Sequence, residues 1–250
     1  MLLNYLKVTF RNLWKEKLNA FINLLGLSIG IACAILIIMF VTDELTFDKF
    51  HSKIDDLYRV KTVFTRGAEE RTEGMAPFVF ATTAVEEIPE IEGISVHTSY
   101  SDVIEHDGQT FRETMTLVGE DFFDMFDFEI VSGSTNALLS NPSNIVIDES
   151  TSRKYFGTTD PVNDVLRITI GGELKDYTIG AVIKDVPSNS SLQFNILMGD
   201  ANLTSLFEER QLGHWFMIAG EVYVLLKEGT DPKAVEAKFP PMLESAMGQE

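Results

Sequence analysis

Cysteine is nearly absent from this 250-residue sequence, in which Cys33 is the only one. The chain therefore cannot form an intramolecular disulfide and must hold its fold together by packing. Hydrophobic residues make up 45% of the sequence, which is an ordinary share for a folded protein, and a chain of this length can bury a sizeable core. The scarcity of cysteine thus excludes a disulfide scaffold but not a stable domain.

Motifs for catalysis are also missing. The sequence has no G-x-x-x-x-G-K-[ST] loop to hold ATP phosphates, no G-x-S-x-G around a serine and no D-x-[DN]-x-[DN]-G calcium loop. Its histidines lack the H-E-x-x-H pattern and any neighbouring cysteine. We therefore predict a protein that is not an enzyme, with no catalytic residue, no cofactor and no metal.

Positive charge is scarce after residue 42. The formal net charge is −18; residues 1–21 carry +3 and residues 22–42 carry none, so residues 43–250 must sum to −21. Nucleic acid is excluded as a partner because phosphate binding needs a cationic patch. A solvated acidic surface that keeps a domain soluble is the simpler interpretation, and binding of cationic ligands is the alternative.

One long apolar run predicts a membrane span. Residues 24–41 read LLGLSIGIACAILIIMFV without a charge, and Ile22 and Asn23 extend the run. About 20 helical residues cross the hydrocarbon core of a bilayer, and a buried helix of a soluble domain would show a polar stripe. A cleaved signal peptide is the alternative, but its apolar region is usually about 7–15 residues long. We predict an uncleaved transmembrane helix over residues 22–42.

The charges on either side of the span predict its orientation. Basic residues precede it, whereas Asp43, Glu44 and Asp48 follow it. Positive charge is retained on the cytoplasmic side of membranes, so the N-terminus is expected in the cytoplasm and residues 43–250 outside.

Residues 1–21 have the pattern of an amphipathic helix. Leu2, Leu6, Phe10 and Trp14 recur at helical spacing with basic residues between them, which suits the interface between membrane and water. Packing on a partner subunit below the membrane is the alternative. The residues predicted to anchor this helix at the interface are Lys7, Arg11, Trp14, Lys15 and Lys17.

Three small residues within the span share one helical face. Gly26, Gly30 and Ala34 are four positions apart, and small residues let a second helix approach closely in lipid. Glycine and alanine are also common in membrane helices for no special reason. We expect this face to contact another helix.

The outer domain is predicted to be α+β, because strands and helices interleave without regular βαβ spacing. We expect a mixed α/β core in two lobes. The predicted elements are a strand at Leu57–Phe64, a helix from Pro77 to about Ile88, a hairpin of Ile94–Glu105 with Gln109–Val118, a helical turn at Phe122–Phe126, a strand at Asn144–Ile147, a helix from Asp148 to Phe156, a hairpin of Val165–Ile170 with Tyr177–Lys184, a strand at Glu221–Leu226 and a final helix from Asp231-Pro232 to Lys238.

Aromatic residues and histidines receive structural predictions. Phe122, Phe123, Phe126 and Phe128 are expected to fill the core between the lobes, with a substrate-facing apolar patch as the alternative. His51 is expected to make a structural hydrogen bond. His97 and His106 are expected on adjacent strands, where they could lie close together.

Several blocks resemble MacB-type, FtsX-like ABC permeases. Residues 10–60 are similar to the opening of that family, including the stretch DELTFDKFH and the later YRV. The blocks that continue the resemblance in order are GEDFFDMFDFEIVSG (119–133), ESTSRKYFGTTDPV (149–162), YTIGAVIKDVPSNSSLQFNIL (177–197) and YVLLKEGTDPKAVEAK (223–238). Departures occur at Asn163-Asp164 and at Ser191, Gln193 and Asn195, where family members often carry other residues.

The resemblance implies a role in transport. It implies a MacB-like periplasmic core domain on a bacterial inner-membrane permease, with further membrane helices beyond residue 250, so we expect a fragment of a longer chain. The implied partners are the membrane, an ABC ATPase subunit that hydrolyses ATP, a second permease copy and a periplasmic adaptor protein. The alternative is a single-span extracytoplasmic sensor or ligand-binding protein, although about 21 residues inside the cell leave no room for a signalling domain.

Overall fold

The computed structural model describes residues 11, 14–67, 69–135, 139, 141–158 and 160–247. The chain divides into two compact units, residues 1–47 and residues 48–250.

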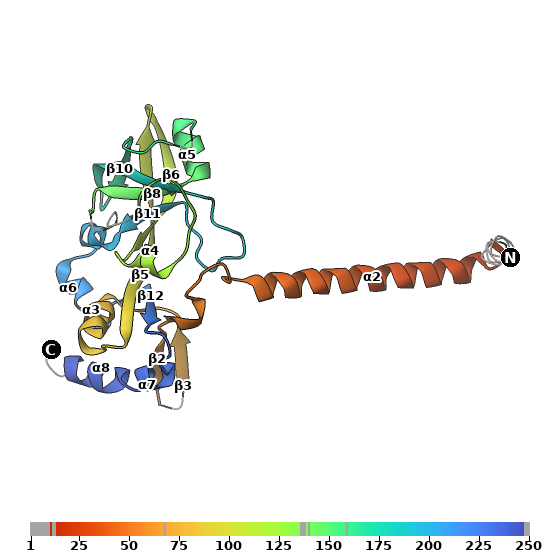
Figure 1. The fold of residues 1–250 in the computed structure, drawn as a ribbon, viewed down its shortest axis with the longest axis horizontal. Helices are drawn as coiled ribbons and strands as arrows, with labels where there is room; N and C mark the ends of the chain where they lie inside the picture. The colour runs from red at the N-terminus through yellow and green to blue at the C-terminus, as the bar shows by residue number, and fades with distance from the viewer. Residues whose placement is uncertain are drawn as a thin grey trace. The chain divides into compact units, whose positions relative to one another are not determined.

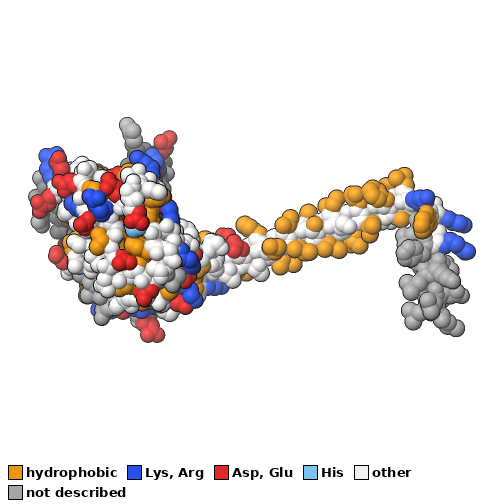
Figure 2. Space-filling view, turned by 90° about the horizontal axis from the view of Figure 1, so that it is seen from above, with side chains coloured by type: hydrophobic (Ala, Val, Ile, Leu, Met, Phe, Trp, Pro, Cys, Tyr) orange, Lys and Arg blue, Asp and Glu red, His pale blue; other side chains and the backbone are white. Residues whose placement is uncertain are grey.

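The first unit is dominated by a single long helix, α2 (Lys17–Thr46), which has no buried residue. Among the described residues it is the only helix long and apolar enough to cross a membrane. Apolar side chains run along the length of α2 in the view of Figure 2, with basic side chains at its N-terminal end and acidic ones at its C-terminal end. The helix extends beyond the predicted span at both ends, since no proline or glycine interrupts the flanking residues.

The second unit is built on one ten-stranded sheet. Its principal path is β1-β12-β5-β6-β11-β8-β10-β7, with β4 beside β12, and β9 pairs with both β10 and β5. Six strands therefore close into a ring, in the order β5, β6, β11, β8, β10 and β9. Few free strand edges remain within this ring. The strands are β1 (Leu57–Arg59), β4 (Ala76–Pro77), β5 (Ile91–His106), β6 (Gln109–Val118), β7 (Ile130–Gly133), β8 (Asn144–Asp148), β9 (Val165–Ile170), β10 (Glu173–Ile183), β11 (Ile196–Gly199) and β12 (Ile218–Leu226).

Two apolar clusters lie on opposite faces of this sheet. Ile145 and Ile147 of β8 belong to the larger cluster, whereas Val146 between them belongs to the smaller one. Successive side chains of a strand point to opposite faces, so β8 must be covered on both. All three residues are fully buried.

Short helices cover the sheet (Figure 1). Phe80 of α3 packs edge-to-face on Phe239 of α8, with ring centroids 5.1 Å apart, which joins these two helices at one end of the domain. The helices are η1 (Ile54–Asp56), α3 (Phe78–Glu87), α4 (Phe122–Met125), α5 (Glu149–Phe156), η2 (Asp200–Ser205), α6 (Glu209–Leu212), α7 (Pro232–Glu236) and α8 (Phe239–Met247).

Local signals in the sequence predicted several elements correctly. The β5–β6 hairpin turns at Asp107 (φ 48°) and Gly108 (φ 74°), and both residue types tolerate left-handed backbone. Asp148 caps α5 by accepting a hydrogen bond from the Thr151 N–H (2.7 Å), and Gly157 (φ 67°) ends that helix. The α+β fold class is confirmed.

Other predicted elements need correction. The single strand expected at Leu57–Phe64 is two strands: β1 pairs with β12, whereas β2 (Thr62–Arg66) pairs with β3 (Glu69–Glu73) in a separate hairpin. The final predicted helix ends at Glu236, and α8 follows it. Pro240 and Pro241 fit the first turn of α8 because the first N–H groups of a helix need no intrahelical acceptor.

The two predicted lobes share one sheet. β5 is 16 residues long and pairs with β12 near its start and with β9 near its end. Because one strand runs through both parts, residues 48–250 form a single compact unit.

Replacing Asp148 with alanine should destabilise the outer domain. This side chain is 2% exposed and also accepts a hydrogen bond from the Asn195 amide, which ties α5 to the residue before β11. We expect a loss of about 2 kcal/mol and a melting temperature lower by about 4–8 °C, measured by circular dichroism on the whole chain in detergent. The exposed control Asp160→Ala should change stability by less than about 0.5 kcal/mol; equal losses would contradict the capping role.

Candidate functional site

The predicted helix-packing face is open on α2. At Gly26 and Gly30, no atom outside the helix lies within 4 Å of the position that a Cβ would occupy. Ala34 continues the same face one turn later and is also exposed. The backbone of α2 is thus accessible to a second helix along this face, and its pairing stays a prediction.

The predicted interfacial anchor is partly described. Arg11, Trp14, Lys15 and Lys17 are exposed, with Trp14 at 68%. Lys7 lies outside the described residues. An exposed tryptophan beside three cations has the composition of a membrane-interface segment, and this role also remains a prediction.

Residues 48–53, here called the entry segment, are the first part of the outer domain after α2. Asp48 adopts left-handed backbone (φ 56°), which aspartate tolerates better than most residues. Its N–H donates to the Asn189 carbonyl oxygen (2.9 Å), and its carboxylate accepts from the Ser191 N–H (2.8 Å). Asp48 therefore fastens the start of the domain to the loop before β11.

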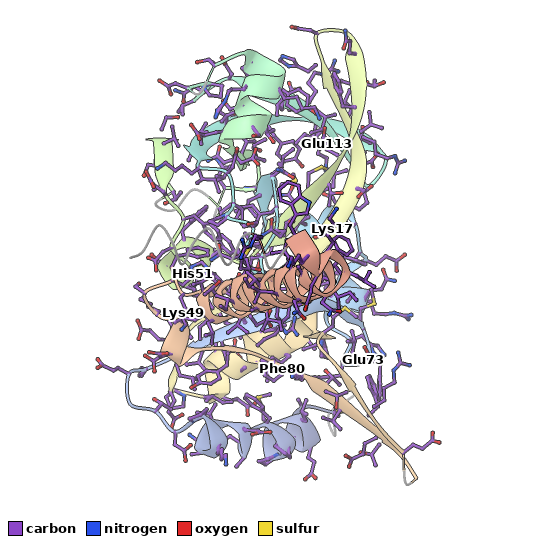
Figure 3. The ribbon with its side chains drawn as sticks, turned by 90° about the vertical axis from the view of Figure 1, so that its right-hand side faces the viewer. Lys17, Lys49, His51, Glu73, Phe80 and Glu113 are labelled. Atoms are coloured by element: carbon purple, nitrogen blue, oxygen red, sulfur yellow. The ribbon has the colours of Figure 1, made fainter. Side chains whose placement is uncertain are left out.

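A second set of bonds fastens the entry segment to α4 and the loop after it. The Asp127 N–H donates to His51 Nδ1 (3.0 Å), and the Asp127 carboxylate accepts from the Ser52 N–H. Lys53 Nζ donates to the Asp124 carbonyl oxygen (2.9 Å). Asp127 thus bonds to both His51 and Ser52, and the segment is bound on two sides. Figure 3 labels His51 and the neighbouring Lys49 in this segment.

His51 is enclosed by aromatic rings. It is 2% exposed, and its ring lies 4.0 Å from Phe50 and 5.3 Å from both Phe126 and Phe128, centroid to centroid. Burial lowers the pKa of His51 against the opposing effect of the Asp48 and Asp127 carboxylates. Since Nδ1 accepts a hydrogen bond, a neutral ring carries its proton on Nε2. The predicted structural hydrogen bond of His51 is confirmed.

The aromatic residues predicted as core lie in the smaller apolar cluster. Phe122 and Phe126 are buried, and Phe123 and Phe128 are partly buried beside them. Phe122 stacks on Phe128 with ring centroids 5.6 Å apart. The core role is confirmed, while the partial exposure of Phe123 and Phe128 leaves one side of the cluster open.

His97 also lies in this cluster. Its ring is 4.7 Å from Tyr223 and 5.2 Å from Phe122, and its Nε2 lies 3.1 Å from the Ser95 hydroxyl. Burial lowers the pKa of His97 to about 3. The expected proximity of His97 and His106 is wrong, because both residues are on β5 and pair with Val118 and Gln109 at opposite ends of β6.

The geometry of the entry segment supports mechanical attachment more than chemistry. Among the described residues, no group of three His, Cys, Asp or Glu side chains is placed to hold a metal ion. The roles of Asp127, Asn189 and Ser191 were missed from the sequence, because only the fold brings the loops that carry them to residues 48–53.

Comparison with known proteins gives a consistent family. A family model described as the MacB-like periplasmic core domain matches residues 20–241. A domain of a protein assigned as a permease, from Porphyromonas gingivalis, is 27% identical with a TM-score of 0.67, over 78% of this chain and 83% of that one.

A more distant structure shares the fold. The periplasmic region of MacB from Actinobacillus actinomycetemcomitans is 16% identical with a TM-score of 0.52, over 69% of this chain and 75% of that one. None of the curated proteins compared with the chain matches it.

Replacing Gly30 with leucine should weaken association between copies of the chain. A leucine side chain would fill the open face of α2 and keep a second helix at a distance. We expect a clear loss of signal in a bacterial membrane two-hybrid assay. Ala32→Leu, a similar enlargement on the opposite face, is the matched control. Equal signals from both variants would contradict the proposed face.

The stability of the outer domain should depend on pH through His97. The unfolded chain binds a proton at this histidine below about pH 6.5 and the folded chain only near pH 3, so the contribution of His97 to stability is full above pH 6.5 and decreases as the pH falls. Between pH 6.5 and 5 this contribution should fall by about 2 kcal/mol, measured by urea unfolding as the difference between the wild type and His97→Gln.

His97→Gln should remove the contribution of His97 and leave that of Asp200. Burial and the nearby Glu120 carboxylate raise the pKa of Asp200 to about 6. The contribution of Asp200 to stability therefore decreases as the pH rises from about 4 to 6, opposite in sign to that of His97. This contribution cancels in the difference between the two proteins. An unchanged slope in His97→Gln would show that His97 is not its source.

Proposed function

Because the chain belongs to the family of MacB-like periplasmic core domains, we propose that it serves as part of an ABC-transporter permease, in which α2 crosses the bacterial inner membrane and residues 43–250 work in the periplasm. The charge distribution supports this orientation. Residues 1–21 carry +3 and the outer part carries −21, as expected for a chain with its N-terminus in the cytoplasm. In this proposal, residues 1–21 are the interfacial helix, and Lys7, Arg11, Trp14, Lys15 and Lys17 anchor it.

The role proposed for the domain is to receive motion from the membrane helix. A moving helix can displace a domain only if the connecting residues do not simply extend. The hydrogen bonds of the entry segment are the observation that supports this proposal. Asp48 bonds to the loop before β11, and His51, Ser52 and Lys53 bond to α4 and the loop after it. Force applied at residue 48 would therefore reach the loops at 124–127 and 189–191 directly.

The proposed energy source is a separate ATPase subunit. The sequence has no loop for ATP phosphates, and ABC permeases are not themselves the ATPase. The open face at Gly26, Gly30 and Ala34 is suited to a second copy of the permease. A periplasmic adaptor protein and an efflux role complete the proposal.

The test compares movement of the outer domain with and without an intact entry segment. The full-length permease and its ATPase are placed in nanodiscs in a Cys33→Ser background, with a spin label at exposed Glu70 of β3. We expect the distance between labels on two copies, measured by pulsed electron resonance, to change on ATP binding. Asp48→Ala combined with Asp127→Ala should reduce that change by at least half while ATP hydrolysis continues.

Asp55→Ala is the matched control, since Asp55 is an exposed acid close to the same segment. It should preserve the nucleotide-dependent distance change. If the double variant moves as the wild type does, the entry segment does not transmit the motion. If ATP changes no distance in the wild type, the transport proposal itself fails.

A further inference from the structure

A polar cavity of about 370 Å³ lies between the sheet and the loop that precedes β11. His97 and Ser99 of β5, Thr116 of β6 and Glu221 of β12 line it from three neighbouring strands, and residues 191–194 line it from the loop. This volume is within the usual range for sites that bind small molecules, about 300–1,000 Å³.

The cavity is nearly neutral in a domain of strong negative charge. Glu221 is the only described lining residue that is charged at neutral pH, because burial lowers the pKa of His97 to about 3. The Glu221 carboxylate lies 3.1 Å from the Arg59 guanidinium and also accepts a hydrogen bond from the Tyr223 hydroxyl (2.9 Å). An ionic ligand would find no uncompensated charge to pair with, so the cavity suits a neutral polar ligand.

Several polar groups of the cavity have unused hydrogen-bonding capacity. Thr116 is 9% exposed, and its hydroxyl lies 3.4 Å from the Ser99 hydroxyl, which is longer than a normal O–H···O bond. His97 is 6% exposed; its Nε2 lies 3.1 Å from the Ser95 hydroxyl, and its Nδ1 has no partner among the described residues. Gln193 donates from Nε2 to two loop carbonyl oxygens, which leaves its Oε1 as an acceptor. Buried polar groups normally have partners, so these groups indicate a place where a ligand completes their hydrogen bonds.

One side of the cavity is apolar. Phe122 and Phe194 line it from the smaller apolar cluster, with their rings edge-to-face at 5.7 Å. Val118 and Leu192 add aliphatic surface. A matching ligand must therefore carry hydroxyl groups and C–H surface close together, and a sugar ring carries both.

The strands that line the cavity offer no free edge to a peptide. β5 lies between β12 and β6, β6 lies between β5 and β11, and β12 lies between β1 and β5. Their backbone groups bond within the sheet, so an extended peptide cannot add to them as a strand. Recognition here depends on side chains, which favours a saccharide over a peptide.

Hydroxyl groups continue from the cavity along the β5–β6 hairpin. Ser99 pairs with Thr116, and the next pair on the same face is Ser101 with Thr114, whose hydroxyl oxygens are 2.7 Å apart. Ser99, Ser101 and Thr114 are exposed. These two pairs form an uncharged track that leads out of the cavity.

We infer that the cavity and the track bind a neutral oligosaccharide. One sugar unit enters the cavity, where its C–H surface packs on the two phenylalanine rings and its hydroxyls bond to Thr116, His97 and Gln193. The next unit lies over Ser101 and Thr114.

Binding at this cavity would reach the entry segment. Ser191 lines the cavity, and its N–H donates to the Asp48 carboxylate (2.8 Å). A sugar in contact with residues 191–194 would stabilise the loop that holds Asp48. This consequence rests on the proposed function, whereas binding itself does not.

The experiment measures sugar binding to the whole chain in nanodiscs, without an ATPase, by saturation-transfer difference NMR. The probes are maltotetraose, cellotetraose and chitotetraose, each compared with its monosaccharide. We expect saturable binding of at least one tetrasaccharide, tighter than that of its monosaccharide. Because the site is neutral, the affinity should change less than about twofold between low and high salt.

Two variants test the geometry. Thr116→Val removes the buried hydroxyl with little change of shape and should weaken binding of the tetrasaccharide and the monosaccharide at least about threefold. Ser101→Ala combined with Thr114→Val alters only the track, so it should weaken the tetrasaccharide by a similar factor and leave the monosaccharide unchanged. Thr72→Val, the same change on the exposed strand β3, is the matched control and should bind as the wild type does.

Melting curves of each variant establish that the domain is folded. Since Ser101 and Thr114 are exposed, the track variant remains a valid test if Thr116→Val lowers stability. The inference fails if no tetrasaccharide binds at millimolar concentration, or if the bound sugar is insensitive to both variants. Binding of the neutral peptide acetyl-Gly-Ser-Gly-Ser-amide in place of sugars would assign the cavity to a peptide and overturn the inference. Intact sugar binding without any ATP-driven movement would overturn the proposed function alone.

Discussion

The hydrogen bonds that join Asp127 to His51 and Ser52 are the constraint on which the position of the entry segment depends. His51 Nδ1 accepts a hydrogen bond from the Asp127 N–H, and the Asp127 carboxylate accepts one from the Ser52 N–H. The His51 ring lies among aromatic rings and is buried, which shields its hydrogen bond from water. Together with Asp48 these bonds make the residues that follow α2 a fixed part of the outer domain. The sequence Asp-x-Phe-His in DELTFDKFH thus has a physical explanation: it supplies a left-handed backbone position, an exposed aromatic ring and a hydrogen-bond acceptor.

The distribution of charge around α2 and its apolar surface both suit a helix that lies in a membrane. A helix that is apolar on every side is stable only where water is excluded, and α2 has no buried residue. Basic residues before it and acidic residues after it favour one orientation across a membrane. The small-residue face gives this helix a way to meet another without a polar group. These features depend on one helix and on no long-range contact, so they can be recognised in the sequence.

Elements that depend on nearby residues could be predicted from the sequence, whereas features that depend on long-range contacts could not. The caps of α5 and the β5–β6 turn depend on residues within a few positions, so Asp148, Gly157 and Asp107-Gly108 predicted them well. The division between β1 and β2 depends on pairing with β12, more than 160 positions away in the register Leu57 to Leu225, and nothing near Val60 indicates it. The cavity lined by Phe50, Phe123 and Lys184 was missed for the same reason, because the fold brings its three separate segments together. The block resemblance supplied the family, but not these contacts.

The long strand β5 has a consequence for how the outer domain can move. It forms part of the closed ring of strands and also carries β12, so any rotation between the two parts would have to twist a 16-residue strand and break its pairing with β6. Such a sheet resists internal bending far more than a flexible loop does. The domain should therefore behave as a lever arm, whose far end travels further than its base for a small tilt. A modest displacement near residue 48 would then appear as a larger excursion at the β5–β6 tip.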